Sequence, residues 1–175
     1  MKVTITLRDI RRAVVAWSGG LDTTALIPLL VEDYAAEVYP LFVNRFQENY
    51  AREEAAVNSL SALFKQRYPA KFHDPFRLTV PIPPPEFRQA FPSVSVEKTH
   101  ALRNSDIVNQ AVRYALLIDA DAVTVGSNTG DTFGDSSENY WKRKDEEVRA
   151  GLKDSRIRVI AIYHELKMDK KDIVR

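Results

Sequence analysis

The chain has 175 residues, 45% of them hydrophobic, which is enough for one substantial core and favours a single domain over 1–175. Its 25 lysines and arginines balance 24 acidic residues, so the net charge of +1 provides no general attraction to nucleic acid or to an anionic membrane. The absence of cysteine excludes disulfides, thiol nucleophiles and thiolate zinc sites, and it suits a reducing compartment.

Residues 1–10 precede the first predicted element. They alternate apolar and polar side chains, so they lack the continuous apolar stretch of a signal peptide. No later segment reaches membrane-spanning length. We therefore expect a cytoplasmic protein that has no membrane partner.

The first half of the chain predicts three strands that alternate with two helices. Short β-branched runs mark the strands, and apolar residues at helical spacing mark the helices. In chain order these are strand 12–17, helix 22–36, strand 38–43, helix 49–68 and strand 76–82. Pro28 removes a backbone hydrogen bond from the first helix, which predicts a kink there.

The second half begins with a proline-rich segment. Residues 81–92 hold five of the nine prolines, which predicts an extended surface loop without a helix between two halves of one fold. A capping pair, Asp169 and Asp172, predicts the start of a last short helix. Between these, the predicted elements are helix 100–118, strand 122–126, helix 137–150 and strand 157–163.

Strands that alternate with helices predict an α/β fold. We expect an open, doubly wound, mainly parallel five-stranded sheet with helices on both faces, which is a Rossmann-like arrangement. Ligands of such sheets bind beyond the carboxyl ends of the strands. The loops after Trp17, Val43 and Val125 are therefore the predicted binding region.

The loop after the first strand reads Ser18-Gly19-Gly20-Leu21-Asp22-Thr23-Thr24. Its two glycines let the backbone approach an anion closely, its hydroxyls offer further donors, and the following helix start attracts phosphate. Asp22 would repel phosphate oxygens unless a cation lies between them, so it predicts Mg²⁺. For the loop taken alone, the alternative is a turn in which Ser18 or Asp22 only caps the helix.

The whole loop resembles the Ser-Gly-Gly-x-Asp-Ser/Thr signature of the N-type ATP pyrophosphatases, the PP-loop superfamily, which cleave ATP between its α and β phosphates. Later segments are most similar to the 7-cyano-7-deazaguanine synthase family. The matching segments are Gln47, Arg103-Asn104, Gly126-Ser127-Asn128-Thr129-Gly130-Asp131, Asp135 and Asp169-Lys170-Lys171-Asp172-Ile173-Val174. The resemblance implies a fold of the adenine nucleotide alpha hydrolase type, ATP and Mg²⁺ as cofactors, and a homodimer.

The chain departs from this family at three places. The zinc-binding cysteines near the family's carboxyl end have no counterpart, so we expect no zinc. Ser136 stands where the family usually has a cysteine, and the loop at 81–92 does not align. The phosphate-binding half of the resemblance therefore rests on more matching residues than the half that binds the acceptor substrate.

The resemblance also assigns roles to residues of this sequence. Three residues are expected to take part in catalysis. Arg103 and Lys170 would act directly, and Asp22 would act through the metal ion that it holds. The residues expected to bind ATP are Ser18, Gly19, Gly20, Leu21, Asp22, Thr23, Thr24, Gly126 and Asn128. Those expected to bind the acceptor are Gln47, Arg103, Asn104, Asp131 and Asp135.

Each of these residues also has a simpler interpretation when it is taken without the resemblance. Arg103 is equally a surface arginine at a helix start, and Lys170 is a solvated charge in a lysine-rich stretch. The segment from Gly126 to Asp131 has the composition of an ordinary turn.

The implied reaction is an ATP-dependent carbon–nitrogen ligation in queuosine biosynthesis. It adenylates a carboxylate and would convert 7-carboxy-7-deazaguanine and ammonia, both small molecules, into 7-cyano-7-deazaguanine (preQ0). Two alternatives stay open: adenylation of another acceptor, in tRNA modification or amide formation, and binding of an adenine nucleotide without turnover. The balanced charge does not favour binding to nucleic acid.

Overall fold

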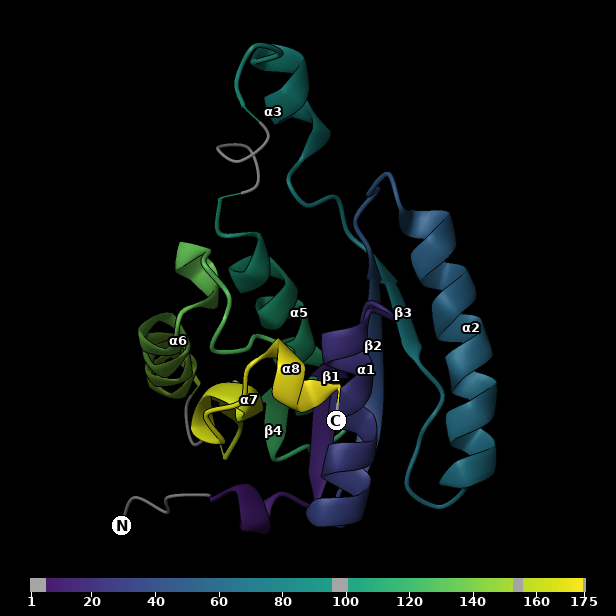
Figure 1. Cartoon of the computed structure of the whole chain (residues 1–175). Helices are drawn as coiled ribbons and strands as arrows, with labels where there is room; N and C mark the ends of the chain where they lie inside the picture. The colour runs from purple at the N-terminus through teal and green to yellow at the C-terminus, as the bar shows by residue number, and fades with distance from the viewer. Residues whose placement is uncertain (1–5, 96–100, 153–155, 175) are drawn as a thin grey trace.

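The computed structural model describes residues 6–95, 101–152 and 156–174, and its centre is a parallel five-stranded sheet (Figure 1). The strand order is β3-β2-β1-β4-β5, and all four pairings are parallel. This arrangement confirms the predicted α/β fold. The strands are β1 (Arg12–Ala16), β2 (Glu37–Asn44), β3 (Phe76–Thr79), β4 (Ala122–Thr124) and β5 (Arg158–Ile160).

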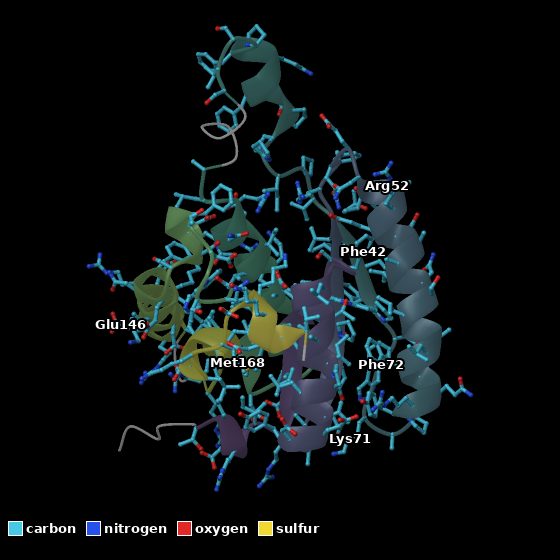
Figure 2. All side chains as sticks on the ribbon, in the orientation of Figure 1. Phe42, Arg52, Lys71, Phe72, Glu146 and Met168 are labelled. Atoms are coloured by element: carbon cyan, nitrogen blue, oxygen red, sulfur yellow. The ribbon has the colours of Figure 1, made fainter. Side chains whose placement is uncertain are left out.

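Helices cover both faces of the sheet because its strand residues are apolar on both sides. Val15 packs into the core cluster that includes residues of α1 and α2, whereas Val14 packs into the cluster that includes residues of α5 and α6. Figure 2 shows Phe42 and Phe72 on the side of α2 that faces the sheet. The longer helices that cover the two faces are α1 (Leu21–Pro28) and α2 (Tyr50–Arg67) on one side, and α5 (Arg103–Leu117) and α6 (Glu138–Gly151) on the other.

The winding direction of the chain reverses beside β1. The chain runs from β1 to β2 and β3 on one side, and then returns to place β4 on the other side of β1. The carboxyl ends of β1 and β4 are thus neighbours whose following segments leave toward opposite faces. Such a reversal opens a crevice at the strand ends, which is where ligands of these sheets bind.

The first helix is interrupted, whereas the sequence predicted a single helix over 22–36 with a kink at Pro28. The α-helix α1 ends at Pro28, and a π-helical segment, η2, covers Leu29–Asp33. Proline has no N–H to donate, so the regular hydrogen-bond ladder is interrupted at the predicted position.

The prediction that prolines exclude a helix from 81–92 is wrong. A short helix, α3, covers Pro85–Ala90. Pro85 occupies the first helical position, where the missing N–H would have no helical partner, and no proline follows until Pro92. Figure 1 shows α3 beyond the carboxyl ends of the strands, away from the sheet.

The prediction of a strand over 157–163 is also wrong for the second half of that range. β5 ends at Ile160, and Ile162–Glu165 form the short helix α7. Ile162 and Tyr163 are buried, and a short apolar run does not distinguish a strand from a buried helix. The Asp169–Asp172 capping box is confirmed, and it opens α8 (Lys170–Ile173).

The remaining boundaries move by a few residues. The third strand ends at Thr79 rather than at 82, and the helix expected at 100–118 is described from Arg103, with His100 outside the described residues. Two short 3-10 helices, η1 (Leu7–Asp9) and η3 (Gly134–Ser136), complete the described elements. None of the helices in the described ranges has the length and apolarity needed to cross a membrane.

Candidate functional site

The loop from Ser18 to Thr24 connects β1 to α1 at the reversal point of the sheet. Gly19 has a φ of +75°, a left-handed conformation that L side chains rarely adopt. A Cβ on Gly19 would also lie 3.1 Å from the Cβ of Ala56 and 3.2 Å from the backbone oxygen of Glu53. Glycine is therefore required here both by the backbone conformation and by the close packing of the loop on α2.

The loop presents several backbone donors that have no strong partner. Within the described ranges, the N–H groups of Gly19, Leu21 and Asp22 have no acceptor. The N–H groups of Ser18 and Gly20 reach only hydroxyl oxygens of the same loop, each at 3.4 Å. Free N–H groups in a turn at a helix start form a binding site for anions such as phosphate.

The two threonines of the loop have different positions. Thr23 Oγ1 donates to the backbone oxygen of Gly20 at 3.3 Å, a long bond that an anion can replace. Thr24 Oγ1 instead accepts from Trp17 Nε1 at 3.0 Å. The Trp17 ring lies 6.2 Å from Phe64 and 6.0 Å from Phe72, so Thr24 attaches the loop to the core.

Gly126 follows β4 by two residues and packs against the start of α1. A Cβ at this position would lie 2.8 Å from Thr23 Cγ2 and 2.9 Å from Thr23 N. No side chain fits without displacing the loop. The loops after β1 and β4, far apart in sequence, are thus in direct contact.

Asp22 has the least satisfied polar side chain of the loop. Its Oδ1 is buried and has no partner among the described residues, while its Oδ2 lies 3.8 Å from Lys170 Nζ of α8. Tyr163 Oη donates to the backbone oxygen of Asp22 at 2.7 Å, and burial raises the pKa of Tyr163, which keeps it a donor. The structure therefore brings together two of the predicted catalytic residues, Asp22 and Lys170.

The carboxylate of Asp22 is suited to a magnesium ion that phosphate oxygens also hold. No group of three or more histidine or acidic side chains in the described part of the chain could hold a metal ion by itself. Magnesium is commonly held by one or two carboxylates together with substrate phosphates. The unpartnered oxygen of Asp22 would be the protein ligand of such an ion, and the free N–H groups of the loop would hold the phosphates.

A cavity of about 440 Å³ lies across the carboxyl ends of β1, β2 and β4. This volume is in the range of small-molecule sites. Its apolar wall includes Val43, Val108 and Trp141. Its polar and glycine lining consists of Ser18, Thr23, Arg45, Glu53, Arg103, Asn104, Gly126, Ser127, Asp131 and Ser136.

The predicted acceptor residues on α5 and η3 hold each other in place. The backbone N–H of Asn104 donates to Asp135 Oδ2 at 3.2 Å, which caps the start of α5. The Asn104 side chain donates to Asp135 O at 3.3 Å and to Ser136 Oγ at 3.1 Å. Asn104 lines the cavity, whereas Asp135 does not line it and instead holds the first turn of α5.

The turn after β4 is internally bonded. Asp131 Oδ2 accepts from Asn128 N at 3.0 Å and from Ser127 Oγ at 3.1 Å. Asn128 Oδ1 accepts from Gly130 N at 2.9 Å. Asp131 lines the cavity, whereas Asn128 is buried outside it.

Gln47 does not line this cavity. It lines a second cavity of about 630 Å³ next to the proline-rich segment. Gln47 accepts from Arg45 N at 2.9 Å and donates to Glu53 Oε2 at 2.6 Å, so it supports two residues of the first cavity.

Sequence reasoning missed Arg45, Glu53 and Phe133, which line the first cavity. Arg45 directly follows β2, at one of the three strand ends where ligands were expected, so its position was an available signal. Glu53 lies in the first turn of α2 and has no comparable signal. Burial lowers the pKa of Arg45, and the charge of Arg103 lowers it further.

Comparisons with known proteins show which family the sequence is similar to. The sequence matches no established family model. It is 35% identical over 134 residues to the curated 7-cyano-7-deazaguanine synthase of Acetivibrio thermocellus, over 71% of this chain and 56% of the relative. The chain thus spans a little over half the length of that relative.

Solved structures share the fold at low sequence identity. One is a protein described as a predicted subunit of tRNA methyltransferase from Methanocaldococcus jannaschii, with a TM-score of 0.57, 12% identity and coverage of 94% of this chain and 74% of that one. Another is the U34-tRNA thiolase NcsA from Methanococcus maripaludis, with its 4Fe-4S cluster, with a TM-score of 0.52, 14% identity and coverage of 94% and 54%.

The β1 loop, the later motifs and the curated relative lead to the same assignment. The match to the relative covers 71% of this sequence at 35% identity. The chain is a 7-cyano-7-deazaguanine synthase-like member of the PP-loop ATP pyrophosphatase superfamily whose sequence has no cysteine.

Proposed function

We propose that this protein is an ATP-dependent ligase that adenylates a carboxylate, with 7-carboxy-7-deazaguanine and ammonia as its substrates. The observation that carries the proposal is the loop from Ser18 to Thr24, which combines free backbone N–H groups with the unpartnered carboxylate oxygen of Asp22. The name of the Acetivibrio thermocellus relative supports the acceptor.

In this proposal, the β1 loop holds the pyrophosphate part of ATP. The N–H groups of Gly19 and Gly20 and the hydroxyl of Thr23 contact phosphate oxygens, and Gly126 lets the turn after β4 pack against Thr23 without displacing this loop. Magnesium held by Asp22 and the phosphates would neutralise part of the charge that develops on the leaving pyrophosphate. Lys170 lies beside Asp22 and provides a second positive charge at the same place.

The proposed reaction has two stages of activation by ATP. A carboxylate oxygen of the acceptor attacks the α phosphorus, the bond from that phosphorus to the bridging oxygen breaks, and pyrophosphate leaves. Ammonia then displaces AMP from the acyl adenylate to form the amide and releases a proton. The amide oxygen then attacks the α phosphorus of a second ATP and pyrophosphate leaves; loss of AMP and of both amide protons gives the nitrile.

No side-chain nucleophile is needed for these steps. The contribution of the protein is alignment of the two substrates and stabilisation of charge, which are the main sources of catalysis in nucleotidyl transfer. Lys170 at the loop is the proposed cation beside the phosphates, and Arg103 at the cavity is the proposed cation for the acceptor.

The test compares Asp22→Asn with the wild-type protein. The substitution keeps the side-chain size and removes the charge, so we expect pyrophosphate release in the presence of 7-carboxy-7-deazaguanine and ammonia to fall on the order of 100-fold or more. Asp33→Asn is the matched control, because Asp33 is exposed at the end of η2. It is expected to leave the rate unchanged.

The outcomes separate the proposal from its alternatives. A wild-type rate in Asp22→Asn contradicts the assigned role of Asp22. Acceptor-dependent AMP with other carboxylates, but none with the deazapurine, indicates a different acceptor. Tight ATP binding without AMP formation under any of these conditions indicates a nucleotide-binding module.

A further inference from the structure

Two arginines that belong to different halves of the chain meet at the cavity. Arg45 follows β2, and Arg103 is the first residue of α5. Both line the first cavity, and both also line the second cavity beside the proline-rich segment. They therefore stand at the boundary between the two spaces, on the same cavity as Ser18 and Thr23 of the β1 loop.

Neither guanidinium has a hydrogen bond or ion-pair partner within the described ranges. Two carboxylates face the same cavity, but both have other partners. Glu53 accepts from the amides of Gln47 and Asn49, at 2.6 Å and 2.7 Å. Asp131 Oδ2 accepts the two hydrogen bonds of its own turn. The nearby acidic groups are thus hydrogen-bonded to neutral donors, and Glu53 acts on Arg45 through its charge without forming an ion pair with it.

The position of each arginine is electrostatically unfavourable without a ligand. Arg103 opens a 15-residue helix, where the helix dipole disfavours a positive side chain. Arg45 is partly buried, and the charge of Arg103 is near enough to lower its pKa. An anion between the two guanidiniums would relieve both effects.

The backbone next to each arginine is strained. Phe46, directly after Arg45, and Leu102, directly before Arg103, both have a φ of +60°. Bulky side chains rarely adopt this left-handed conformation, which is found at ligand clamps and active sites. Both side chains are exposed, so apolar burial does not account for the strain.

We propose that Arg45 and Arg103 form a two-guanidinium clamp that binds the carboxylate of a planar heteroaromatic acceptor. The inference rests on the proposed function, and it adds Arg45 and a specific role for the pair. A carboxylate matches the planar fork of a guanidinium and accepts paired hydrogen bonds from it. The β1 loop already offers donors to the phosphates of ATP, so the clamp is left for the acceptor, whose ring packs against the apolar wall.

Calorimetry with 7-carboxy-7-deazaguanine tests the clamp without requiring turnover. We expect Arg45→Gln and Arg103→Gln each to weaken acceptor binding roughly 10- to 100-fold, the range for loss of charge-assisted hydrogen bonds. Arg45→Lys keeps the charge but not the fork, so it should fall between wild type and Arg45→Gln. Arg113→Gln removes the same charge from an exposed position of α5 and should bind like wild type.

Two further titrations identify the group that the clamp recognises. The carboxamide analogue of the acceptor should bind weakly and equally to wild type and to both glutamine variants. The affinity for a non-hydrolysable MgATP analogue should not change in any variant. Circular dichroism verifies folding, and the Arg45→Lys and Arg103→Lys variants replace any glutamine variant that does not fold.

The clamp and the proposed function can fail separately. Acceptor binding that is lost in the arginine variants, in a protein that releases no pyrophosphate, supports the clamp and contradicts the ligase. Pyrophosphate release with an unchanged acceptor KM in both variants supports the ligase and overturns the clamp. A wild-type protein that does not bind the acceptor, or variants that lose MgATP affinity instead, also overturn the clamp.

Discussion

At the scale of single residues, Gly126 shows how a contact between two loops constrains the sequence. The start of α1 leaves no space for a Cβ at this position, because Thr23 lies within 3 Å of where it would be. Gly134 lies in the same part of the chain, but no heavy atom lies within 4 Å of a Cβ added there. The two glycines therefore form a matched pair for substitution.

Gly126→Ala is expected to displace the β1 loop. Overpacking of this kind typically costs about 1–3 kcal/mol of folding stability. A shift of about 1 Å at the phosphates should lower the rate of pyrophosphate release on the order of 100-fold. Thermal denaturation and a pyrophosphate assay measure the two effects.

Gly134→Ala is the control for this experiment. It should change the free energy of unfolding by less than about 0.5 kcal/mol, the usual range for an open surface position. Equal stabilities and equal rates for the two alanine variants would show that Gly126 does not constrain the loop.

At the scale of elements, β2 is connected to the segment before β3 by a polar cluster at the end of the sheet opposite the cavity. Glu37 Oε2 accepts from Tyr39 Oη at 3.0 Å and lies 3.1 Å from His73 Nε2. The rings of Tyr39 and His73 are stacked with centroids 3.8 Å apart. The hydrogen bond to His73 contributes most to lowering the pKa of Glu37 below its usual value of 4.5, and the bond to Tyr39 adds to this effect.

This cluster predicts a specific pH dependence of stability. Because the folded state lowers the pKa of Glu37, its stabilisation is complete above the unfolded pKa and is lost as the pH falls through the folded pKa. Glu37→Gln should therefore destabilise the protein at pH 7 by less than about 1 kcal/mol, since the pair is partly solvated. The difference from wild type should shrink below about pH 4.5 in urea unfolding series.

Glu146→Gln is the matched control for the charge change. Glu146 is exposed on α6 and labelled in Figure 2, far from β2. Its substitution should leave the acid limb of the stability curve as in wild type. A Glu37→Gln deficit that stays constant down to pH 3 would contradict the role assigned to the carboxylate.

At the scale of the whole molecule, the sheet and the proline-rich segment differ in how they are supported. β1 pairs with strands on both sides and is covered by helices on both faces. α3 is exposed along its described side chains and lies apart from the sheet in Figure 1. Few buried contacts mean a low free energy of local opening.

Hydrogen exchange should reproduce this difference. Amides of β1 and β4 are expected to exchange slowest, at rates that report global unfolding, and those of α3 fastest. Mass spectrometry of peptic peptides measures both in one experiment. Protection of α3 equal to that of β1 would mean that the segment packs against the body of the protein in solution.

Much of the fold could be predicted because it depends on local patterns. The β-branched runs of β1 and β2 and the helical spacing of α2 are strong signals in the sequence itself, and they led to the parallel sheet. The failures have local causes. The helix at Pro85 begins with proline at its first position, where proline is tolerated, and Ile162 is apolar whether it is in a strand or in a helix.

The sequence by itself determined the β1 loop, since Gly19, Gly20 and Asp22 are adjacent in the chain and their spacing carries the chemistry. Only the tertiary structure decided which distant side chains meet there. It placed Lys170 beside Asp22 and Arg45 with Arg103 on one cavity, because the reversal of winding beside β1 brings the ends of separate strands together. Contacts of this kind depend on the path of the whole chain and have no pattern at short range.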